Sequence, residues 1–420
     1  MPFSTLGLTP AMLRAISSKA YLAPTPIQRA AIPAALQGRD VLGSAQTGSG
    51  KTAAFALPLL QKLEQTTLYT PRRVLALVLV PTRELAVQIG DTLRSLAQPL
   101  PQAVKISTVF GGVSINPQMM GLRGGTDIMV ATPGRLLDLL NHNALSLAHV
   151  ATLVLDEADR LLDLGFADEL NRIVALLPKQ RQNLFFSATF PAAVQALANT
   201  LLHDPLRVDV LPDPQAPLDI VQTAIAVDVG RRTQLLRHLI LQNGWSRVLV
   251  FVATKHAAEI VADKLRKAQI NAEPFHGALS QGKRSQVLMD FKAARLAVVV
   301  ATDVAARGID IAQLPVMVNY DLPRSAVDHT HRIGRTGRAG ERGLAISFVT
   351  ADTQAHFHLI EKRQGIRLPL AQVAGFEPVE QITVPENSPT DAANGGIKGK
   401  RPSKKDKLRA AAQNLPKDVL

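Results

Sequence analysis

A glycine-rich segment near the N-terminus, Ala45–Thr52, reads AQTGSGKT and has the residue types of a phosphate-binding loop. Its glycines leave room for phosphate oxygens to approach backbone N–H groups, and Lys51 would reach the outer phosphates. The hydroxyl of Thr52 would bind Mg²⁺. Ala45 stands where the general pattern has glycine, so a plain strand-to-helix turn is the alternative interpretation. The nucleotide contacts expected from this segment are Gln46, Thr47, Gly48, Ser49, Gly50, Lys51 and Thr52.

An acidic tetrad, Asp156–Asp159, reads DEAD and directly follows the apolar run Thr152–Leu155. A carboxylate at the end of a buried parallel strand lies at the sheet edge where α/β proteins bind ligands. Asp156 would hold the Mg²⁺ through water, and Glu157 would position or deprotonate an attacking water. Such a tetrad alone is usually a solvated helix start. Together with a phosphate loop it predicts nucleotide hydrolysis, which needs mainly positioning and charge neutralisation.

A basic segment in the second half, His331–Arg338, reads HRIGRTGR. Arg332, Arg335 and Arg338 recur every three residues, which predicts a place near one face of a helix. A plain exposed basic face would give the same pattern. The second half has no phosphate loop of its own, so we expect these arginines to act on a γ-phosphate held by the first half. An arginine finger of this kind is worth roughly 10³–10⁵ in rate.

Strand-like and helix-like segments alternate around these motifs. This order predicts βα units and parallel sheets covered on both faces, which is an α/β fold. Helices are expected at Ala53–Leu57, Arg83–Ala97 and Lys255–Lys267. The expected strands are Asp40–Ser44, Val74–Val80, Ile128–Ala131, Thr152–Leu155, Leu184–Phe186, Val248–Val252, Ala297–Ala301 and Val316–Asn319.

The second half of the sequence repeats features of the first. Val78–Ile89 (VLVPTRELAVQI) and Val248–Ile260 (VLVFVATKHAAEI) each combine a buried strand, a Thr and a helix-like segment. Ile128–Arg135 (IMVATPGR) and Val298–Arg307 (VVVATDVAAR) each end a strand at Ala-Thr before a turn. These echoes predict a duplicated α/β domain, although matches this short also arise by chance. The expected domains are residues 1–208 and 220–370, with a proline-containing linker at 209–219 and a tail at 371–420.

Length and composition narrow the class of protein. At roughly 150 residues per domain, 420 residues predict two or three domains, and 46% hydrophobic residues suffice for sizeable cores. The absence of cysteine excludes disulfides, cysteine-ligated metals and a thiol nucleophile. The longest apolar run in a strand-like segment, Val74–Val80, falls far short of the ~18 residues that span a bilayer. No signal peptide is recognisable, so we expect a cytoplasmic protein without membrane contact.

The charge balance indicates a polyanionic partner. A formal net charge of +13 favours nucleic acid, whereas an aromatic content of 4% argues against a protein that stacks bases on many rings. Lys398–Arg409 carries seven basic residues and one acidic residue, Asp406. We expect a mostly disordered tail that adds salt-sensitive, sequence-independent affinity for a polyanion. A merely solubilising end is the alternative.

The chain resembles the DEAD-box ATP-dependent RNA helicases of superfamily 2. It contains their motifs in the family order, as AQTGSGKT, DEAD, SAT (Ser187–Thr189) and HRIGRTGR. The chain is most similar to the bacterial RhlE-like branch, with its short N-terminus and basic C-terminal tail. The resemblance extends from Phe3 to about Arg367. It implies two tandem RecA-like domains joined by a short linker, with ATP and Mg²⁺ in the cleft between them and single-stranded RNA across the opposite face.

The resemblance assigns roles around the ATP. Gln28, in the segment PTPIQ, would pair with the adenine edge, and Tyr21 would stack on the ring. Phe3 matches the same adenine-reading segment, whereas Ala20 stands where the family usually has Gly. The remaining assignments are Ser187, Thr189, Asp159 and His331 for coupling to strand separation, Arg335 and Arg338 for the γ-phosphate, and Gly308 and Asp310 for the ribose.

Other matches imply contacts with the RNA backbone. Glycines, hydroxyls and helix N-termini suit sugar–phosphate contacts, which carry little sequence information. We therefore expect RNA, single-stranded or as a short duplex, to bind with little sequence preference. The expected RNA contacts are Thr82, Arg83, Gly111, Gly112, Thr132, Gly134 and Arg135 in the first domain and Thr254, Gln281, Arg284 and Thr302 in the second.

The implied activity is RNA-stimulated ATP hydrolysis that locally unwinds short RNA duplexes or remodels RNA–protein complexes. Ribosomal particles and RNA-decay machinery are the partners that the resembled branch suggests, with ribosome biogenesis as the process. Two alternatives stay open: a DNA-directed helicase or translocase, and a non-catalytic RNA clamp. The clamp is disfavoured by the intact set Lys51, Asp156, Glu157, Arg335 and Arg338.

Overall fold

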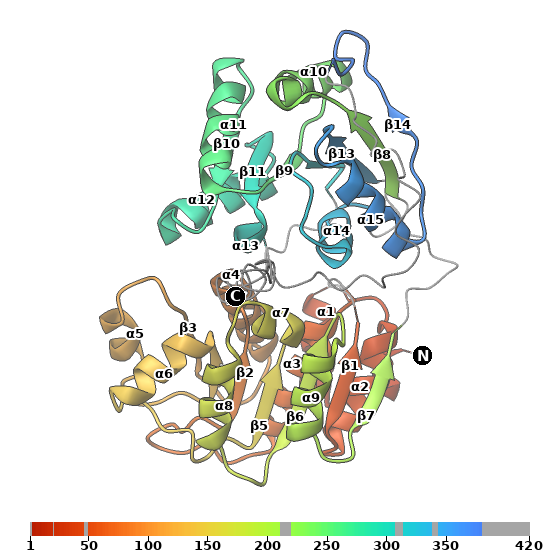
Figure 1. Ribbon diagram of the computed structural model, residues 1–420. Coiled ribbons are helices and arrows are strands. Elements are labelled where there is room, and N and C mark those ends of the chain that lie inside the picture. The colour runs from red at the N-terminus through yellow and green to blue at the C-terminus, as the bar shows by residue number, and fades with distance from the viewer. Residues whose placement is uncertain are drawn as a thin grey trace, which may run out of the picture. The chain divides into compact units, whose positions relative to one another are not determined.

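The computed structural model describes residues 2–19, 21–45, 49–210, 220–306, 314–337 and 343–379. Residues up to Val379 form one compact unit with two seven-stranded sheets (Figure 1). The strand pairs within each sheet are parallel, and helices flank both sheets. This arrangement confirms the expected α/β fold. Within the described residues, no helix is long and apolar enough to cross a bilayer.

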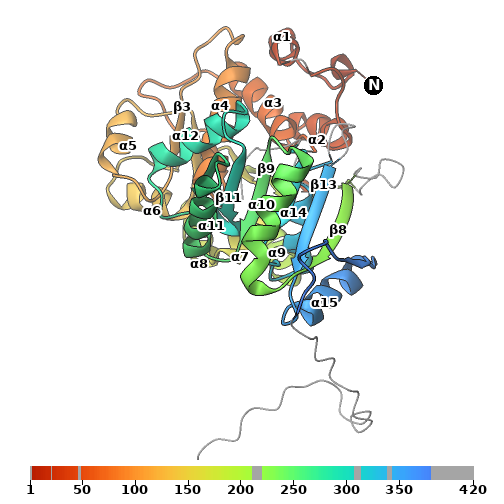
Figure 2. The same cartoon turned by 90° about the horizontal axis from the view of Figure 1, so that it is seen from above.

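The first sheet and its helices, here called domain 1, have the strand order β3-β4-β2-β5-β6-β1-β7. Alternate strand residues enter two cores, so that Val78 packs with α1 to α4 and Leu77 packs with α6 to α9. Figure 2 shows α1 to α4 on one side of domain 1 and α7 to α9 on the other. Its strands are β1 (Val41–Ser44), β2 (Ala76–Leu79), β3 (Ile106–Val109), β4 (Ile128–Ala131), β5 (Thr152–Leu155), β6 (Gln182–Ser187) and β7 (Leu206–Asp209). Its helices are η1 (Phe3–Thr5), α1 (Pro10–Ser18), α2 (Pro26–Leu36), α3 (Lys51–Glu64), α4 (Arg83–Ala97), α5 (Asn116–Gly121), α6 (Pro133–Asn141), α7 (Ala158–Asp163), α8 (Ala167–Ala175) and α9 (Ala192–Leu201).

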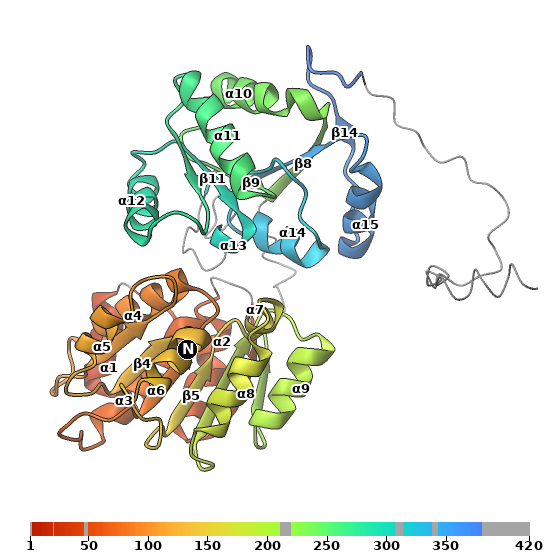
Figure 3. The ribbon, with the colours of Figure 1, turned by 60° about the vertical axis from the view of Figure 1, so that its left-hand side comes forward.

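The second sheet and its helices, domain 2, have the strand order β10-β11-β9-β12-β13-β8-β14. Val250 packs on the side of α10 and α11, whereas Phe251 packs on the side of α12, α13 and α14. Figure 3 shows α10 and α11 on one side of this sheet and α13 and α14 on the other. Its strands are β8 (Ile220–Ala226), β9 (Val248–Val252), β10 (Ala272–Phe275), β11 (Val298–Thr302), β12 (Val316–Asn319), β13 (Gly343–Val349) and β14 (Leu370–Ala371). Its helices are η2 (Val229–Arg231), α10 (Arg232–Asn243), α11 (Lys255–Lys267), α12 (Gln281–Lys292), α13 (Asp303–Ala306), α14 (Ala326–Ile333) and α15 (Gln354–Gln364).

Each predicted strand begins and ends within two residues of an observed strand. β4, β5, β9, β12, α4 and α11 have the predicted bounds, and Ala53–Leu57 lies inside α3. Threonine caps explain the helix starts, because each hydroxyl accepts a hydrogen bond from a free N–H of the first turn. Thr82 accepts from the N–H of Leu85 (3.3 Å), and Thr254 accepts from that of Ala257 (3.0 Å).

The packed body continues beyond residue 370, where the sequence predicts the tail to begin. β14 pairs with β8, and Val373 and Phe376 then pack against the core of domain 2. The N–H of Val379 donates to the carboxylate of Asp228 (3.0 Å). Val373 and Phe376 bury apolar surface against domain 2, and this burial holds the segment after β14 on the domain. Most of the expected linker, residues 211–219, and the basic stretch of the tail lie outside the described residues.

A buried histidine joins the last two helices of domain 2. His329 of α14 is 1% exposed, and its Nδ1 accepts a hydrogen bond from the amide of Gln364 on α15 (3.0 Å). Burial, together with the charge of Arg332, lowers the pKa of His329 to about 4. The histidine is therefore neutral in the folded protein at neutral pH.

We expect domain 2 to lose stability as the pH falls from 6.5 to about 4. The folded-state pKa of His329 lies below the unfolded one, so the unfolded chain takes up the proton first. The loss amounts to at most roughly 1.4 kcal/mol per pH unit. His329→Asn should flatten the pH dependence of the unfolding free energy in urea titrations, whereas His256→Asn, at an exposed histidine of α11, should leave it unchanged. Equal slopes for His329→Asn and the parent would contradict this expectation.

Candidate active site

Three motif-bearing segments meet at one edge of the first sheet. The phosphate loop follows β1, the DEAD segment follows β5, and the SAT segment begins at the end of β6. β5, β6 and β1 are adjacent and parallel, so their carboxyl ends lie side by side (Figure 1). The fold therefore brings Lys51, Asp156, Glu157 and Ser187 to the same edge, as the sequence predicts.

A left-handed glycine shapes the described end of the phosphate loop. Gly50 has a φ of 91° and caps α3, and a Cβ here would collide with the amide nitrogen of Gln28. Lys51 begins α3 and is buried, and its ammonium donates to the carbonyl of Ala45 (2.8 Å). Its position at a helix N-terminus favours a bound anion. Thr52 follows and is half-buried, whereas Gln46, Thr47 and Gly48 lie outside the described residues.

Gln28 holds the phosphate loop in place. Its side-chain oxygen accepts from the N–H of Thr25 (3.0 Å), and its amide donates to the carbonyl of Gly50 (3.1 Å). It is only 5% exposed. The residue expected to read adenine thus also fixes the backbone of the loop. Of its two predicted companions, Tyr21 is 37% exposed, whereas Phe3 is buried in the core of domain 1 and has a packing role.

The first two residues of the DEAD segment form a buried acidic pair. Burial raises the pKa of the Asp156 carboxyl to about 6, an effect that the nearby charge of Lys51 opposes. Asp156 Oδ1 also accepts from the N–H of Glu157 (3.0 Å). Glu157 has a left-handed backbone, with a φ of 52°, and is 4% exposed. Its Oε2 has no hydrogen-bond partner among the described residues and lies 3.6 Å from Nε of Arg160.

The SAT segment is bonded to the last residue of the DEAD segment. Asp159 Oδ2 accepts from both the N–H (2.9 Å) and the hydroxyl (2.8 Å) of Thr189. Ser187 Oγ accepts from the N–H of Asp159 (3.2 Å) and donates to the carbonyl of Thr189 (2.8 Å). These bonds agree with the link that the resemblance implies between the two segments.

The arginines of the basic segment do not share one helical face. α14 ends at Ile333, so Arg335 lies beyond the helix and the predicted periodic face is wrong. Arg332 is buried inside domain 2, where its Nε and Nη2 donate to the two oxygens of Asp303 (2.6 and 2.7 Å). Arg335 lines a narrow hollow whose walls also include Arg160, His331 and Arg332. Arg338 lies outside the described residues, as do Gly308 and Asp310.

His331 lies near the acidic motif, as the resemblance implies. Burial, together with the charge of Arg160, lowers its pKa to about 4. The charges of Asp159 and Glu157 act in the opposite direction. The imidazole is therefore neutral at neutral pH and suits a hydrogen bond better than an ion pair.

The residues expected to bind RNA in domain 1 follow β2, β3 and β4. Thr82 caps α4, whereas Thr132, at the start of α6, accepts a hydrogen bond from the N–H of Gly111 (3.3 Å) at its hydroxyl. Gly112 has a φ of 77°, and a Cβ there would collide with the guanidinium of Arg83. Two helix N-termini and a glycine pair thus lie together, which suits contact with phosphates.

Two arginines expected to bind RNA are buried and already paired. Arg135 donates to the carbonyl of Val113 (2.7 Å). Arg284 forms an ion pair of 2.6 Å with Glu84 of domain 1, and burial lowers its pKa. Arg135 thus holds the loop that contains Val113, and Arg284 links α12 to α4. The expected role of both arginines as direct phosphate contacts stays a prediction.

Most of the RNA-assigned residues of domain 1 line a cavity of about 370 Å³. Thr254, an exposed cap of α11, Thr302, at the end of β11, and Gly134, in the first turn of α6, do not line it. Gln281 lines a neighbouring cavity of about 460 Å³ between α4 and α12. The predicted residues that line the first cavity are Thr82, Arg83, Gly111, Gly112, Thr132 and Arg284.

Comparison with known proteins identifies the family. The DEAD/DEAH box helicase family matches residues 25–197, and the helicase conserved C-terminal domain matches residues 231–340. The ATP-dependent rRNA helicase rrp3 of Sclerotinia sclerotiorum is 44% identical over 350 residues, which are 83% of this chain and 71% of that protein. The chain belongs to the DEAD-box family of ATP-dependent RNA helicases.

Further relatives of the helicase support the fold. The ATP-dependent RNA helicase CshA of Listeria monocytogenes is 39% identical, over 89% of this chain and 71% of CshA. S. cerevisiae Dbp5 bound to RNA and ADP BeF3 matches with a TM-score of 0.76 at 30% identity, over 90% of the helicase and 95% of that chain. Mss116p bound to ssRNA and AMP-PNP matches with a TM-score of 0.79 at 28% identity, over 90% and 78%. The tandem RecA-like architecture is thus confirmed, whereas the RhlE-like branch stays a prediction.

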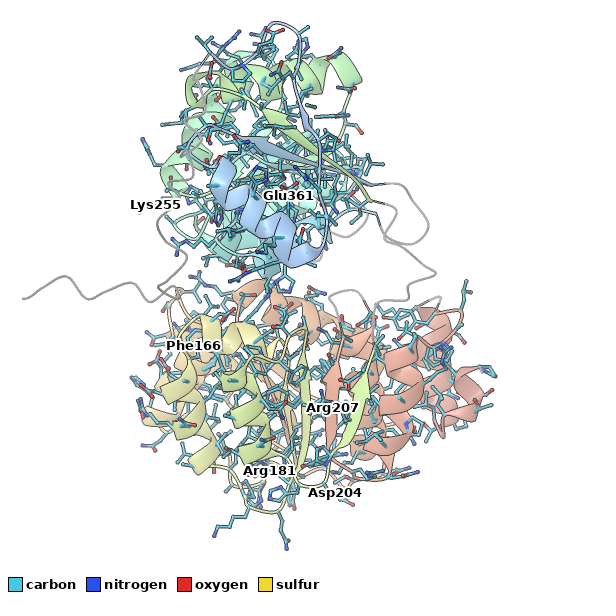
Figure 4. The ribbon with its side chains drawn as sticks, turned by 45° about the vertical axis from the view of Figure 1, so that its right-hand side comes forward. Phe166, Arg181, Asp204, Arg207, Lys255 and Glu361 are labelled. Atoms are coloured by element: carbon cyan, nitrogen blue, oxygen red, sulfur yellow. The ribbon has the colours of Figure 1, made fainter. Side chains whose placement is uncertain are left out.

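The helicase has site residues that its sequence motifs do not single out. Glu84 pairs with Arg284, Arg160 lies beside Glu157, and Phe166 lines the cavity of RNA-assigned residues. Glu84 and Arg160 each lie next to a selected motif residue, which is the only signal the sequence offers. Figure 4 shows Phe166 on domain 1, in the segment between α7 and α8.

Proposed function

We propose that this helicase hydrolyses ATP when RNA is bound and uses the reaction to separate short RNA duplexes or remodel RNA–protein complexes. The observation that carries the proposal is the bonding of Asp159 to Ser187 and Thr189, two residues after the acidic pair. A change at the acidic pair can pass through these bonds to the segment after β6. Hydrolysis and RNA handling would thereby be linked within domain 1.

The residues at this edge fit a Mg²⁺ ion. Asp156 is buried and its pKa is raised, and a divalent cation would favour its ionised form. Within the described residues, no group of three or more His, Cys, Asp or Glu could hold a metal by itself. This agrees with Mg²⁺, which usually takes one or two protein carboxylates together with substrate phosphates. Asp156, through water, and Thr52 would hold the ion, which supplies charge neutralisation.

The chain's own residues would divide the remaining work. Lys51 would bind the outer phosphates from the N-terminus of α3. Glu157, whose Oε2 is buried without a hydrogen-bond partner among the described residues, would orient water and accept its proton. Arg335, from beyond the end of α14, would neutralise charge on the γ-phosphate, together with the predicted Arg338.

RNA would bind through its backbone at the residues that line the 370 Å³ cavity. N–H groups, hydroxyls and arginines there would contact sugar and phosphate, so little sequence preference is expected. The proposal includes cytoplasmic action and ribosomal particles or RNA-decay machinery as partners. These last points rest on the sequence resemblance, and the names of the rrp3 relatives refer to rRNA.

The direct test compares RNA with DNA as stimulators of ATP turnover. We expect single-stranded RNA to raise the steady-state rate and a DNA strand of the same sequence to raise it much less. The Lys51→Ala variant serves as the control for contaminating ATPases and should be inactive with either strand. Equal stimulation by DNA would favour a DNA-directed motor, and equal rates with and without RNA would refute the proposal.

A further inference from the structure

A further cavity lies at the edge of the first sheet opposite to the motifs. The loops that lead into β2, β4 and β5 line it, at residues 71–74, 122–126, 144–146 and 149. The three strands are parallel, so their amino ends meet at this edge and their motif-bearing carboxyl ends at the other. In Figure 4, Arg181 and Asp204, which precede β6 and β7, mark the same lower edge of domain 1. We call this cavity of about 510 Å³ the basal pocket.

The basal pocket is lined by cationic side chains. Arg72, Arg73, Arg123 and His149 contribute to its walls, and its described lining contains no Asp or Glu. The nearby Asp127 is fully buried and accepts a hydrogen bond from Arg72 (2.9 Å). Arg73 and Arg123 are exposed, and no carboxylate of the described residues pairs with either of them. Two guanidinium groups are therefore available to an anion.

Planar groups lie beside these charges. The guanidinium of Arg73 lies 4.4 Å from the ring centroid of Tyr69, and its Nη1 lies 3.0 Å from Nε2 of His149. The Tyr69 and His149 rings are 5.7 Å apart at an angle of 38°. Tyr69 is 41% exposed in a chain with only three tyrosines. Aromatic rings beside arginines are the usual surface for a stacked base and its phosphate.

The backbone gives the basal pocket a fixed shape. Gly124 and Gly125 both have a φ of 79°, and a Cβ on Gly125 would collide with the carbonyl of Arg72. The N–H of Arg72 donates to the carbonyl of Gly124 (3.1 Å), which ties two lining loops together. Lys105 donates to the carbonyl of Arg123 (3.0 Å) and adds a further cation beside the rim. The pocket is thus preformed, and its volume suits a nucleotide-sized ligand.

We propose that the basal pocket binds a nucleotide unit of single-stranded RNA outside the stretch held at the motif-bearing edge. Arg73 and Arg123 contact its phosphates, and the base lies against His149 and the apolar part of the lining, with Tyr69 beside His149. This second contact goes beyond the proposed function. It depends on that function only in one respect, namely that the bound polymer is RNA. The distribution of net charge along the chain agrees with a cationic RNA contact in the folded part. Residues 384–420 hold eight basic and four acidic residues, so most of the net charge of +13 lies before residue 384.

RNA length separates the two contacts. An RNA that occupies both must pass around domain 1, and a domain of some 200 residues has a radius of gyration of about 17 Å. A short oligonucleotide fills the motif-bearing edge only, whereas a long strand also reaches the basal pocket. Loss of the basal pocket should therefore weaken the binding of long RNA and spare that of short RNA.

The experiment measures the affinity of the full chain for short and long oligo(U) by fluorescence anisotropy over a range of salt concentrations. The test variant is Arg73→Gln with Arg123→Gln. The matched control is Arg172→Gln with Arg237→Gln, at exposed arginines of α8 and α10. For a single strand, each neutralised phosphate adds about 0.7 to the slope of log affinity against log salt, so the slope of the test variant should be smaller by about 1.4. Thermal unfolding midpoints equal to the parent's show that both variants fold.

At low salt, we expect the test variant to bind long oligo(U) roughly tenfold more weakly than the parent, and its log affinity should depend less steeply on log salt. Short oligo(U) should bind to the test variant and to the parent with equal affinity. Unchanged affinity and slope for long oligo(U) would overturn the inference. A loss of poly-glutamate binding without a loss of RNA binding would also overturn it and assign the pocket to an acidic protein. Because binding is measured without ATP turnover, a failure of this inference can be told apart from a failure of the proposed function.

Discussion

Replacing Glu157 by Gln should lower RNA-stimulated ATP turnover by roughly 10²–10⁴-fold, the usual contribution of a general base. The carboxylate is 4% exposed, and its Oε2 has no hydrogen-bond partner among the described residues. Arg160 lies 3.6 Å away, beyond hydrogen-bond distance, and a buried acceptor without a hydrogen bond is costly unless a ligand or water uses it. Glutamine keeps the shape of the side chain and loses the site that accepts a proton. We therefore expect turnover to fall while ATP and RNA still bind.

Rapid-quench measurement of ATP hydrolysis, with separate binding titrations for RNA and an ATP analogue, checks this result. The control is Asp168→Asn, at an exposed carboxylate in the first turn of α8, which should keep the parent's rate. Turnover by Glu157→Gln close to that of the parent would remove Glu157 from its proposed role.

The largest expected effect is that of Arg335→Ala, which should lower turnover by roughly 10³–10⁵-fold if Arg335 acts as an arginine finger. Arg335 lies just after α14 and lines the hollow that contains Arg160 and His331. Its guanidinium would therefore face the acidic motif, where charge develops on the γ-phosphate. The loss should appear in kcat, because a finger acts chiefly on the transition state.

Arg332 provides a contrast from the same motif. Arg332 is buried and forms a bidentate pair with the half-buried Asp303, and its guanidinium also donates to Asn319 (2.9 Å). Removing the guanidinium of Arg332 leaves the Asp303 carboxylate without its partner. Arg332→Ala should therefore lower the thermal unfolding midpoint of domain 2. Arg335→Ala should change that midpoint much less. A loss of activity by Arg335→Ala that is matched by an equal loss of stability would contradict the proposed role.

Much of the fold and the motif placement follows from the sequence, because local signals specify them. Apolar β-branched runs marked β4, β5, β9 and β12 with their observed bounds, and Thr82 and Thr254 marked the starts of α4 and α11. A parallel sheet then places whatever follows each strand at one edge. The meeting of Lys51, Asp156 and Ser187 also requires β5, β6 and β1 to be neighbours, and this strand order comes from the structure.

Other features depend on contacts that residue spacing does not contain. A three-residue repeat predicted one helical face for Arg332 and Arg335, but α14 ends between them at Ile333. Arg284 lines the cavity of RNA-assigned residues, but its ion pair with Glu84, two hundred residues earlier in the chain, was not predicted. The basal pocket joins three loops that are separate in sequence. Such pairings arise from tertiary packing and could be found only in the structure.

The central proposal is most directly tested by strand release from a short RNA duplex. The full chain is mixed with a labelled duplex, and release of the labelled strand is followed with and without ATP in the presence of a trapping strand. We expect ATP-dependent release from short RNA duplexes, slower release as the duplex lengthens, and little release from a DNA duplex of the same sequence. RNA strand release that is independent of ATP, or equal rates on the two duplexes, would contradict the proposed RNA helicase activity.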